Sequence, residues 1–184
     1  SLVLFDMETP GVSTRPIKLI SGESPFCETF LDNVRVEKDQ VVGEVDKGWT
    51  IAKYLLTHER SMIGNMGSTA AGQKTLSDLA VDAIGLEDGK LADSMLRTEV
   101  ASWVIDSIGY ELTAERARDE AKSGQGVGNV SAMLKYAGTE LNKRRYELLV
   151  AAYGSEGLLW EGDERPAGAL PQQWLRTKGN SIEG

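Results

Sequence analysis

The stretch that decides the fold spans residues 46–85 and reads DKGWTIAKYLLTHERSMIGNMGSTAAGQKTLSDLAVDAIG. One set of mostly apolar or small positions recurs in it every three or four residues, which is the spacing of one face of an α-helix. Asp46 is a suitable N-cap and Gly85 a suitable stop. The pattern therefore predicts one long helix from about Trp49 to Gly85. The positions on its face are Ala52, Leu55, Glu59, Met62, Met66, Ala70, Gln73, Leu76, Ala80 and Ile84.

The same spacing continues further along the chain. It predicts a second helix over residues 90–121, a third over residues 129–153 and a short fourth helix that carries Trp174 and Leu175. Three long amphipathic helices and a short one, joined by short loops, are typical of a four-helix bundle. We therefore expect residues 45–184 to form a helical-bundle domain.

Residues 1–44 have a different pattern, in which short apolar runs alternate with turn signals such as Pro10-Gly11 and Asp32-Asn33. A few short strands in a segment of this length do not make an independent sheet domain. We therefore expect them to be the last strands of a β domain that begins upstream, in a longer protein. The predicted fold class is mainly α: a four-helix bundle preceded by these strands.

Composition excludes several functional classes. The chain has 184 residues and a formal net charge of −8, which disfavours nucleic-acid binding because phosphate contacts need Lys and Arg. The strong basic run, Lys143-Arg144-Arg145, is expected to be a solvated helix face. No apolar run approaches the roughly 20 residues of a membrane span, and no signal peptide is visible. The single cysteine, Cys27, and single histidine, His58, predict neither a disulfide nor a metal site, and indicate a cytoplasmic protein.

One acidic residue breaks the apolar face of the first predicted helix. Glu59 lies four residues after Leu55 and three before Met62. Burying a carboxylate costs several kcal/mol unless the group is paired or protonated. Arg60 follows directly, but successive helical residues are about 100° apart, so the two are not automatic partners. Glu59 is therefore either a structural ion-pair or helix-edge residue, or a residue retained for chemistry.

Several motifs occur in a recognisable order along the chain. They are DMETPGV at 6–12 with RPI at 15–17, FLDNVRV at 30–36, VGEVDKGW at 42–49 and RTKGNSIEG at 176–184. In order and spacing this set resembles the acyl-CoA dehydrogenase family. The resemblance implies that residues 1–44 are the C-terminal part of the family's middle β domain and that residues 45–184 are its C-terminal helical domain.

The resemblance also implies a chemistry. Family enzymes use FAD to oxidise an acyl-CoA thioester to the trans-2-enoyl thioester. A carboxylate removes the proton α to the thioester carbonyl, and the β hydrogen leaves as hydride to the flavin. An acyl-CoA substrate, electron-transfer flavoprotein or a similar acceptor, and a homo- or hetero-oligomer formed through the helical domain are therefore expected.

Two positions for the catalytic base are used in the family. In one group of members the base lies on the first helix of the C-terminal domain, immediately before an arginine, and Glu59-Arg60 matches that arrangement. Most members instead place it just before the closing GTSE segment, where Glu183 is a rival candidate. If the chain continues Gly-Thr, Gly184 occupies that slot and Glu183 precedes it. We favour Glu59 as the base, and Arg60 resembles the arginine that supports the CoA-binding region.

The sequence also departs from the family pattern. The RxxFG segment that contacts the FAD of a neighbouring subunit has no equivalent between residues 90 and 128. The QxxGGxG loop is represented only by Gly154, Ser155 and Gly157, with Ala151 in the glutamine slot. These three residues are the cofactor-binding candidates, although a plain helix C-cap and turn explains them equally well. Two alternative functions remain open: a non-catalytic partner subunit of a heteromeric acyl-CoA dehydrogenase, and a flavin monooxygenase on the same fold.

Overall fold

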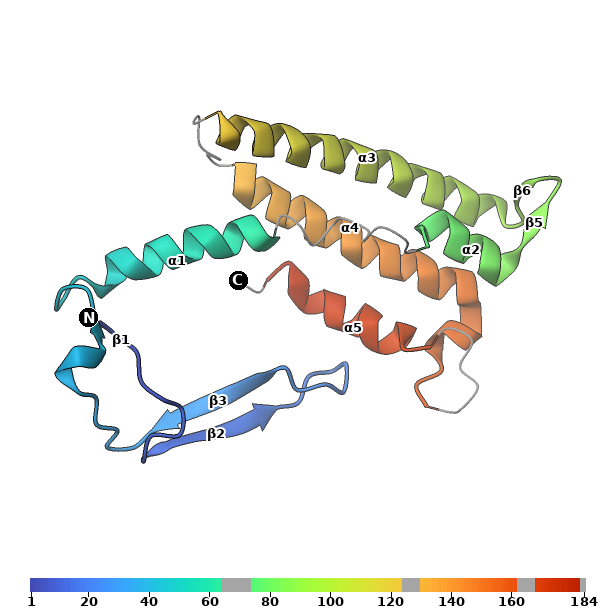
Figure 1. Ribbon diagram of the computed structural model, residues 1–184. Helices are drawn as coiled ribbons and strands as arrows, with labels where there is room; N and C mark the ends of the chain where they lie inside the picture. The colour runs from blue at the N-terminus through green and yellow to red at the C-terminus, as the bar shows by residue number, and fades with distance from the viewer. Residues whose placement is uncertain (64–73, 124–129, 162–167, 183–184) are drawn as a thin grey trace. The chain divides into compact units, whose positions relative to one another are not determined.

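The computed structural model describes residues 1–63, 74–123, 130–161 and 168–182, without the side chains of residues 57–63 and 131 (Figure 1). The chain divides into two compact units, Ser1–Met62 and Ile63–Gly184. Each unit is described by itself. The expected domain boundary between residues 44 and 45 stays a prediction.

The first unit contains short antiparallel strands and one helix. The hairpin of β2 and β3 is in register from Val12 opposite Leu31 to Ile17 opposite Phe26, and almost all its side chains are exposed. A two-stranded ribbon cannot bury its own apolar side chains. The elements are β1 (Leu2–Val3), β2 (Val12–Ile17), β3 (Phe26–Leu31), the 3-10 turn η1 (Lys38–Gln40), β4 (Val41–Val42), which pairs with β1, and α1 (Gly48–Ile63).

The start of α1 differs from the expectation. Asp46 is not its N-cap, because the helix begins at Gly48 and Asp46 has a φ of +65°. The N–H of Asp46 instead donates to the hydroxyl of Ser1 at 2.9 Å. A Cβ on Gly48 would lie 2.4 Å from the carbonyl carbon of Ser1. Ser1 therefore packs directly against the backbone of Gly48, which leaves no room for a side chain there.

The second unit is a set of helices around α4. Figure 1 shows α4 lying between α3 and α5, and α4 also packs against α2. The third and fourth predicted helices are confirmed by α4 and α5. The elements are α2 (Leu76–Ile84), β5 (Leu86–Glu87), β6 (Lys90–Leu91), α3 (Ser94–Lys122), α4 (Val130–Tyr153), the 3-10 turn η2 (Gly154–Leu158) and α5 (Leu170–Asn180).

The prediction of one continuous helix to Gly85 was wrong. Lys74 and Thr75 are not helical, and Thr75 is the N-cap of α2. Its hydroxyl accepts the N–H of Asp78 at 3.1 Å, and the Asp78 carboxylate accepts the N–H of Thr75 at 3.0 Å. This capping box satisfies amides at a helix start. Periodicity alone could not detect the break, because Leu76, Ala80 and Ile84 keep the spacing of the preceding face.

The second predicted helix starts later than expected. Lys90 belongs to the small hairpin of β5 and β6, whose turn residues Asp88 and Gly89 have φ values of +50° and +71°. An Asp-Gly pair with positive φ is a favoured two-residue hairpin turn. The side chain of Asp93 then caps α3 by accepting the N–H groups of Met95 at 2.8 Å and Leu96 at 2.9 Å. This turn therefore delays the start of the helix to Ser94.

Two apolar clusters hold the second unit together. The larger one joins α2, α3, α4 and α5, and the smaller one joins only α3 and α4. The fold class is confirmed: the chain is mainly α and carries short strands before its helices. The buried members of the larger cluster are Leu76, Ala80, Leu91, Leu96, Val100, Leu148, Leu149, Ala152 and Leu170; those of the smaller one are Tyr110, Ala114, Ala117 and Leu134.

Candidate functional site

The favoured catalytic pair lies on α1. The backbone of Glu59 and Arg60 is helical, and both belong to the first unit. Their side chains lie outside the part of the chain that the structure describes, and so does Glu183. The assignment of the base and of its neighbouring arginine therefore stays a prediction.

The three cofactor-binding candidates lie at the C-terminal end of α4. Gly154 has a φ of +56°, a left-handed conformation that favours glycine, and a Cβ there would meet nothing within 4 Å. Gly157 is buried, and its missing Cβ would lie 3.0 Å from the Tyr153 Cβ and 3.0 Å from the Val150 oxygen. The backbone conformation of Gly154 and the close packing of Gly157 therefore each account for a glycine without a cofactor. Ser155 between them is exposed. Their contact with FAD stays a prediction.

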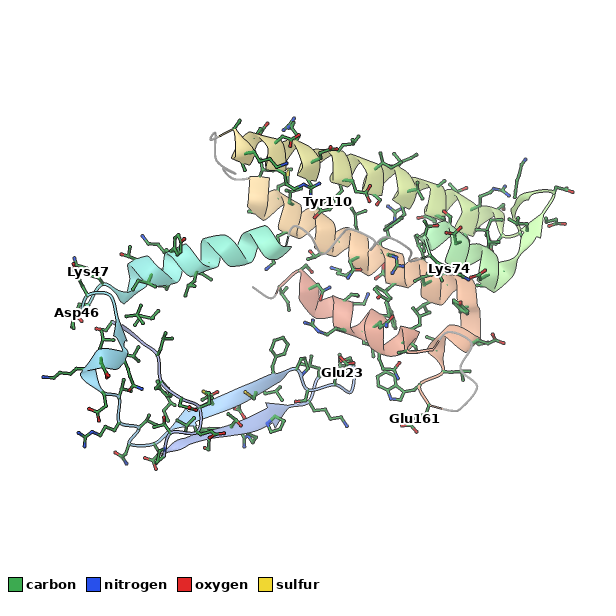
Figure 2. All side chains as sticks on the ribbon, in the orientation of Figure 1. Glu23, Asp46, Lys47, Lys74, Tyr110 and Glu161 are labelled. Carbon is green, nitrogen blue, oxygen red and sulfur yellow. The ribbon has the colours of Figure 1, made fainter. Side chains whose placement is uncertain are left out.

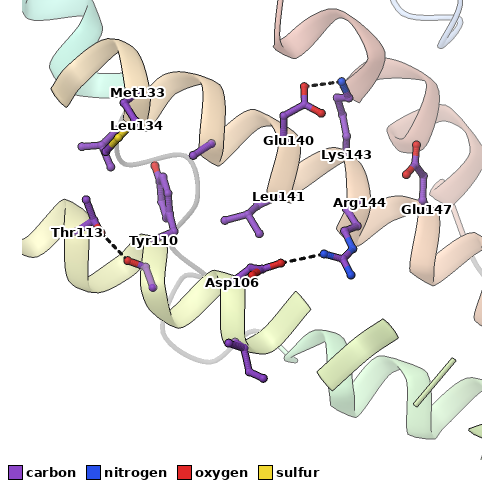
Figure 3. Close-up of a pocket in the computed structure, with 13 residues that line it drawn as sticks. Asp106, Tyr110, Thr113, Met133, Leu134, Glu140, Leu141, Lys143, Arg144 and Glu147 are labelled. Atoms are coloured by element: carbon purple, nitrogen blue, oxygen red, sulfur yellow. Dashed lines mark hydrogen bonds and ion pairs between the residues drawn. The ribbon is translucent and has the colours of Figure 1, made fainter. Parts of the chain in front are cut away.

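A groove of about 940 Å³ runs between α3 and α4 (Figure 3). Its floor is apolar and its rim is charged. Sequence periodicity did not reveal it, because a groove between two helices depends on how far apart they pack. The lining residues are Ile105, Asp106, Gly109, Tyr110, Thr113, Met133, Leu134, Ala137, Glu140, Leu141, Lys143, Arg144 and Glu147.

Tyr110 crosses from α3 towards α4, as Figures 2 and 3 show, and is 8% exposed. Burial raises the pKa of its phenol, although the nearby positive charge of Arg118 acts in the opposite direction. A Cβ on Gly138 would lie 2.7 Å from the Tyr110 hydroxyl. Gly138 is therefore the residue that admits the ring.

Arg144 ties α4 to two turns of α3. Its guanidinium donates to the Asp106 carboxylate at 2.9 Å and to the Glu99 carboxylate at 3.1 Å, and its side chain is 33% exposed. Trp103 adds a hydrogen bond from its indole N–H to the Leu141 carbonyl at 2.8 Å. These bonds run across the helix pair and fix the spacing of the groove.

Lys143 ties α4 to α5. Its ammonium donates to Glu140 Oε1 at 2.7 Å and to Ser181 Oγ at 3.1 Å. Its side chain is 22% exposed. Lys143 and Arg144 are therefore partly buried and paired, which differs from the expectation of a solvated face for the basic run. The partners of Arg144 lie on α3, whereas Lys143 pairs with Glu140 of its own helix and with Ser181 at the end of α5.

The charged rim of the groove is already paired. Asp106 and Glu140 accept from cations of α4, and Glu147 forms an ion pair with Lys178 of α5. Among the described residues, no group of three or more His, Cys, Asp or Glu side chains could hold a metal ion. No helix in the described ranges combines the length and apolarity that crossing a membrane requires. The charged side chains of the rim named here therefore already have ion-pair partners.

A model described as the C-terminal domain of acyl-CoA dehydrogenase matches residues 46–184. That range contains α1 and the whole second unit. The chain therefore belongs to the acyl-CoA dehydrogenase family, and the family resemblance of its motifs is confirmed.

Particular relatives agree with this membership. Acyl-CoA dehydrogenase FadE34 of Mycobacterium tuberculosis is 32% identical over 162 residues, which are 85% of this chain and 21% of the relative. Acyl-CoA dehydrogenase IpdE1 of the same organism is 38% identical over 136 residues, which are 73% of this chain and 34% of the relative. The chain thus spans less than half the length of these relatives.

Solved structures show the same fold. The Tcur3481-Tcur3483 steroid ACAD matches 99% of this chain and 47% of its own with a TM-score of 0.81 at 21% identity. The ChsE4-ChsE5 complex from Mycobacterium tuberculosis matches 99% of this chain and 48% of its own with a TM-score of 0.73 at 18% identity. At these identities the likeness concerns the fold alone.

Proposed function

We propose that this chain forms part of an FAD-dependent acyl-CoA dehydrogenase and supplies its catalytic base. The observation that carries the proposal is the match of the family's C-terminal domain to residues 46–184, a range that includes Glu59 and Arg60 on a helix. The substrate is an acyl-CoA thioester, and the product is the α,β-unsaturated thioester.

The carboxylate of Glu59 takes the proton α to the thioester carbonyl. Bound FAD would supply the acceptor for the β hydrogen and its electron pair, which the formation of the Cα–Cβ double bond requires. For this step a carboxylate needs a desolvated setting that raises its pKa towards that of the activated α proton. Arg60 supports the region that binds CoA.

Gly154, Ser155 and Gly157 are the candidate cofactor contacts of this chain. A Cβ on Gly154 would meet nothing within 4 Å, and Gly157 packs against Val150 and Tyr153 of α4. We therefore derive no step of the reaction from these three residues. A test independent of activity is whether Gly154→Ala weakens FAD binding.

The partners follow from the same proposal. Electron-transfer flavoprotein or a similar acceptor reoxidises the flavin, in a cytoplasmic setting. The helical domain mediates oligomerisation with identical or different chains. Two solved structures of the same fold support this part of the proposal, because their names pair two proteins: ChsE4 with ChsE5, and Tcur3481 with Tcur3483.

Replacing Glu59 by Gln in the complete, FAD-loaded protein tests the assignment. We expect flavin bleaching by acyl-CoA to slow by about 100-fold to 10,000-fold, the usual contribution of a general base, while FAD stays bound. The measurement is stopped-flow absorbance with butyryl-, octanoyl- and palmitoyl-CoA and a steroid side-chain CoA thioester.

The matched control is Glu183→Gln, which should leave bleaching close to the rate of the unmodified protein. Unchanged bleaching in E59Q together with loss in E183Q would transfer the role to Glu183. Unchanged bleaching in both variants would sink the assignment of a base to this chain.

One observation favours a second candidate function, a non-catalytic partner subunit. Ala151 stands where family members carry the glutamine that contacts FAD, and the local packing and backbone conformation account for Gly154 and Gly157 in the loop that follows. Under this alternative, the protein alone would bind no stoichiometric FAD. In a complex with an active partner subunit, the E59Q variant would then support the same turnover as the unmodified protein.

A further inference from the structure

Lys74 and Thr75, the two non-helical residues directly before α2, are held by side-chain bonds that the proposed reaction does not use. The ammonium of Lys74 donates to Oδ2 of Asp82 at 2.6 Å, across eight positions of the chain. Thr75 forms the capping box with Asp78, and its hydroxyl also donates to Oδ2 of Asp78 at 2.7 Å. Two carboxylates of α2 therefore hold the residues that precede their own helix. We call Lys74 and Thr75 the helix stop.

The ion pair of Lys74 with Asp82 is specific to a chain that does not continue the helix. In an α-helix, residues eight positions apart are separated by about 12 Å along the axis. Helical side chains also tilt towards the N-terminus, so a helical Lys74 would point away from Asp82. Its neighbours on the helix surface would be three and four positions on, and the residue four positions on is Asp78. The partner of Lys74 therefore distinguishes a stopped helix from a continued one.

The residue types of the helix stop are compatible with a longer helix. Lysine is a good helix former, and threonine is tolerated. The carbonyl of Thr75 already accepts the N–H of Leu79 at 3.1 Å, as it would inside a helix. The apolar spacing of the sequence also runs across these two residues without a break. Side-chain bonds therefore decide that α2 begins at Leu76.

We propose that the helix stop is a two-state element at the start of α2. In the state described here, the capping box and the bond to Asp82 keep Lys74 and Thr75 outside the helix. In the second state these bonds are exchanged, Lys74 pairs with Asp78, and α2 is longer by two residues. The Thr75 hydroxyl and the Asp82 carboxylate stabilise only the first state, so a change that removes either group favours the longer helix. This inference goes beyond the proposed function and does not rest on it.

Carbodiimide cross-linking of the complete protein tests the element. The reagent joins a lysine to a carboxylate that it contacts, forming an amide while the carbodiimide takes up the elements of water. Mass spectrometry of the peptide that spans residues 74–82 then identifies the carboxylate that has reacted. We expect Lys74 to be joined mainly to Asp82 in the unmodified protein. In Thr75→Ala, the ratio of the Asp82 product to the Asp78 product should fall about fivefold, the effect of losing one helix cap.

Two variants serve as matched controls. Thr75→Ser keeps the hydroxyl of the cap and should keep the ratio of the two products. Glu87→Gln removes an exposed carboxylate of β5 that lies outside the helix stop, and it should also leave the ratio unchanged. If T75A folds poorly, Asp78→Ala removes the other half of the capping box from an exposed position. In D78A the Cα resonance of Lys74 should shift towards the helical range.

An unchanged ratio of products in T75A would overturn the proposal, because the hydroxyl would then not hold the helix stop. A fall of the same size in T75S would contradict it as well. Two further results would have the same consequence: an unmodified protein in which Lys74 is not joined to Asp82, or a Lys74 Cα resonance that does not move in D78A.

Discussion

At the scale of single residues, two helical glycines show how the same residue type serves opposite needs. Gly138 on α4 faces the ring of Tyr110, and a Cβ there would come within 2.7 Å of its hydroxyl oxygen. Gly109 on α3 has nothing within 4 Å of its missing Cβ. The sequence displays both as isolated glycines in helical patterns, and only the packing distinguishes them.

Substituting alanine at the two positions should therefore change stability in opposite directions. Gly109→Ala should raise the free energy of unfolding by about 0.5–1 kcal/mol, the gain in helix propensity. Gly138→Ala should lower it by about 1–3 kcal/mol, because an added methyl in a filled space forces its neighbours to move. Urea denaturation followed by circular dichroism measures both.

Tyr110, which the added Cβ at position 138 would approach, supplies a further check. Tyr110→Phe removes the hydroxyl that lies nearest to the added Cβ, so G138A should be less damaging in that background. Equal losses in both backgrounds would show that the Tyr110 hydroxyl is not the cause, because its ring carbons at 3.0 and 3.2 Å from the added Cβ remain in the phenylalanine.

At the scale of elements, caps and turns decide where helices begin. The face followed by the apolar residues runs through Lys74 and Thr75 without interruption in its spacing, yet α2 starts anew at Leu76. Asp93 caps the start of α3, which follows the hairpin turn at Asp88-Gly89. The helices themselves were predictable because their apolar spacing extends over many residues. Their starts were not, because they depend on single hydrogen-bonding side chains.

Removing the cap of α2 should destabilise the second unit. Thr75→Ala deletes the hydroxyl that accepts the Asp78 N–H, and losing such a cap costs about 1 kcal/mol. Thr75→Ser keeps the hydroxyl and should stay near the stability of the unmodified chain. Thermal unfolding separates the variants, and an equal loss in both would show that the cap is not responsible.

At the scale of the whole molecule, acid should weaken the second unit. The pKa of Glu140 is lowered from 4.5 by its hydrogen bond to Lys143, and that of Asp78 is lowered from 3.8 by its hydrogen bonds to Thr75. A carboxyl whose folded pKa is depressed adds stability above its unfolded pKa and loses it as the pH falls through the folded value. The free energy of unfolding should therefore drop as the pH is lowered below about 4.5.

The variant Lys143→Met (K143M) provides the control for the pH dependence of the free energy of unfolding. Without the ammonium, the pKa of Glu140 should return towards its ordinary range, and the part of the acid sensitivity that Glu140 contributes should shrink to what Ser181 and Lys178 still provide. Denaturant unfolding at pH 7 and at acidic pH compares the two proteins. If the free energy of unfolding changed equally with pH in both proteins, the acid sensitivity would not come from the Glu140–Lys143 pair.

The candidate site was predictable only where motifs mark it. The neighbours of Glu59 and the order of the flanking segments indicated a base on the first helix, and that assignment remains to be tested by E59Q. The groove between α3 and α4 and the clamp of Arg144 on Glu99 and Asp106 were not predictable. Their members lie up to 45 positions apart along the chain, so no local pattern connects them.

By itself, the sequence determined the family and the mainly helical class, because apolar spacing and ordered motifs are properties of the chain alone. The tertiary structure decided that Lys143 and Arg144 are paired between helices rather than solvated. It also decided that Gly138 admits an aromatic ring. The physical reason is that burial depends on which elements pack together, and packing brings distant residues into contact that no spacing along the chain encodes.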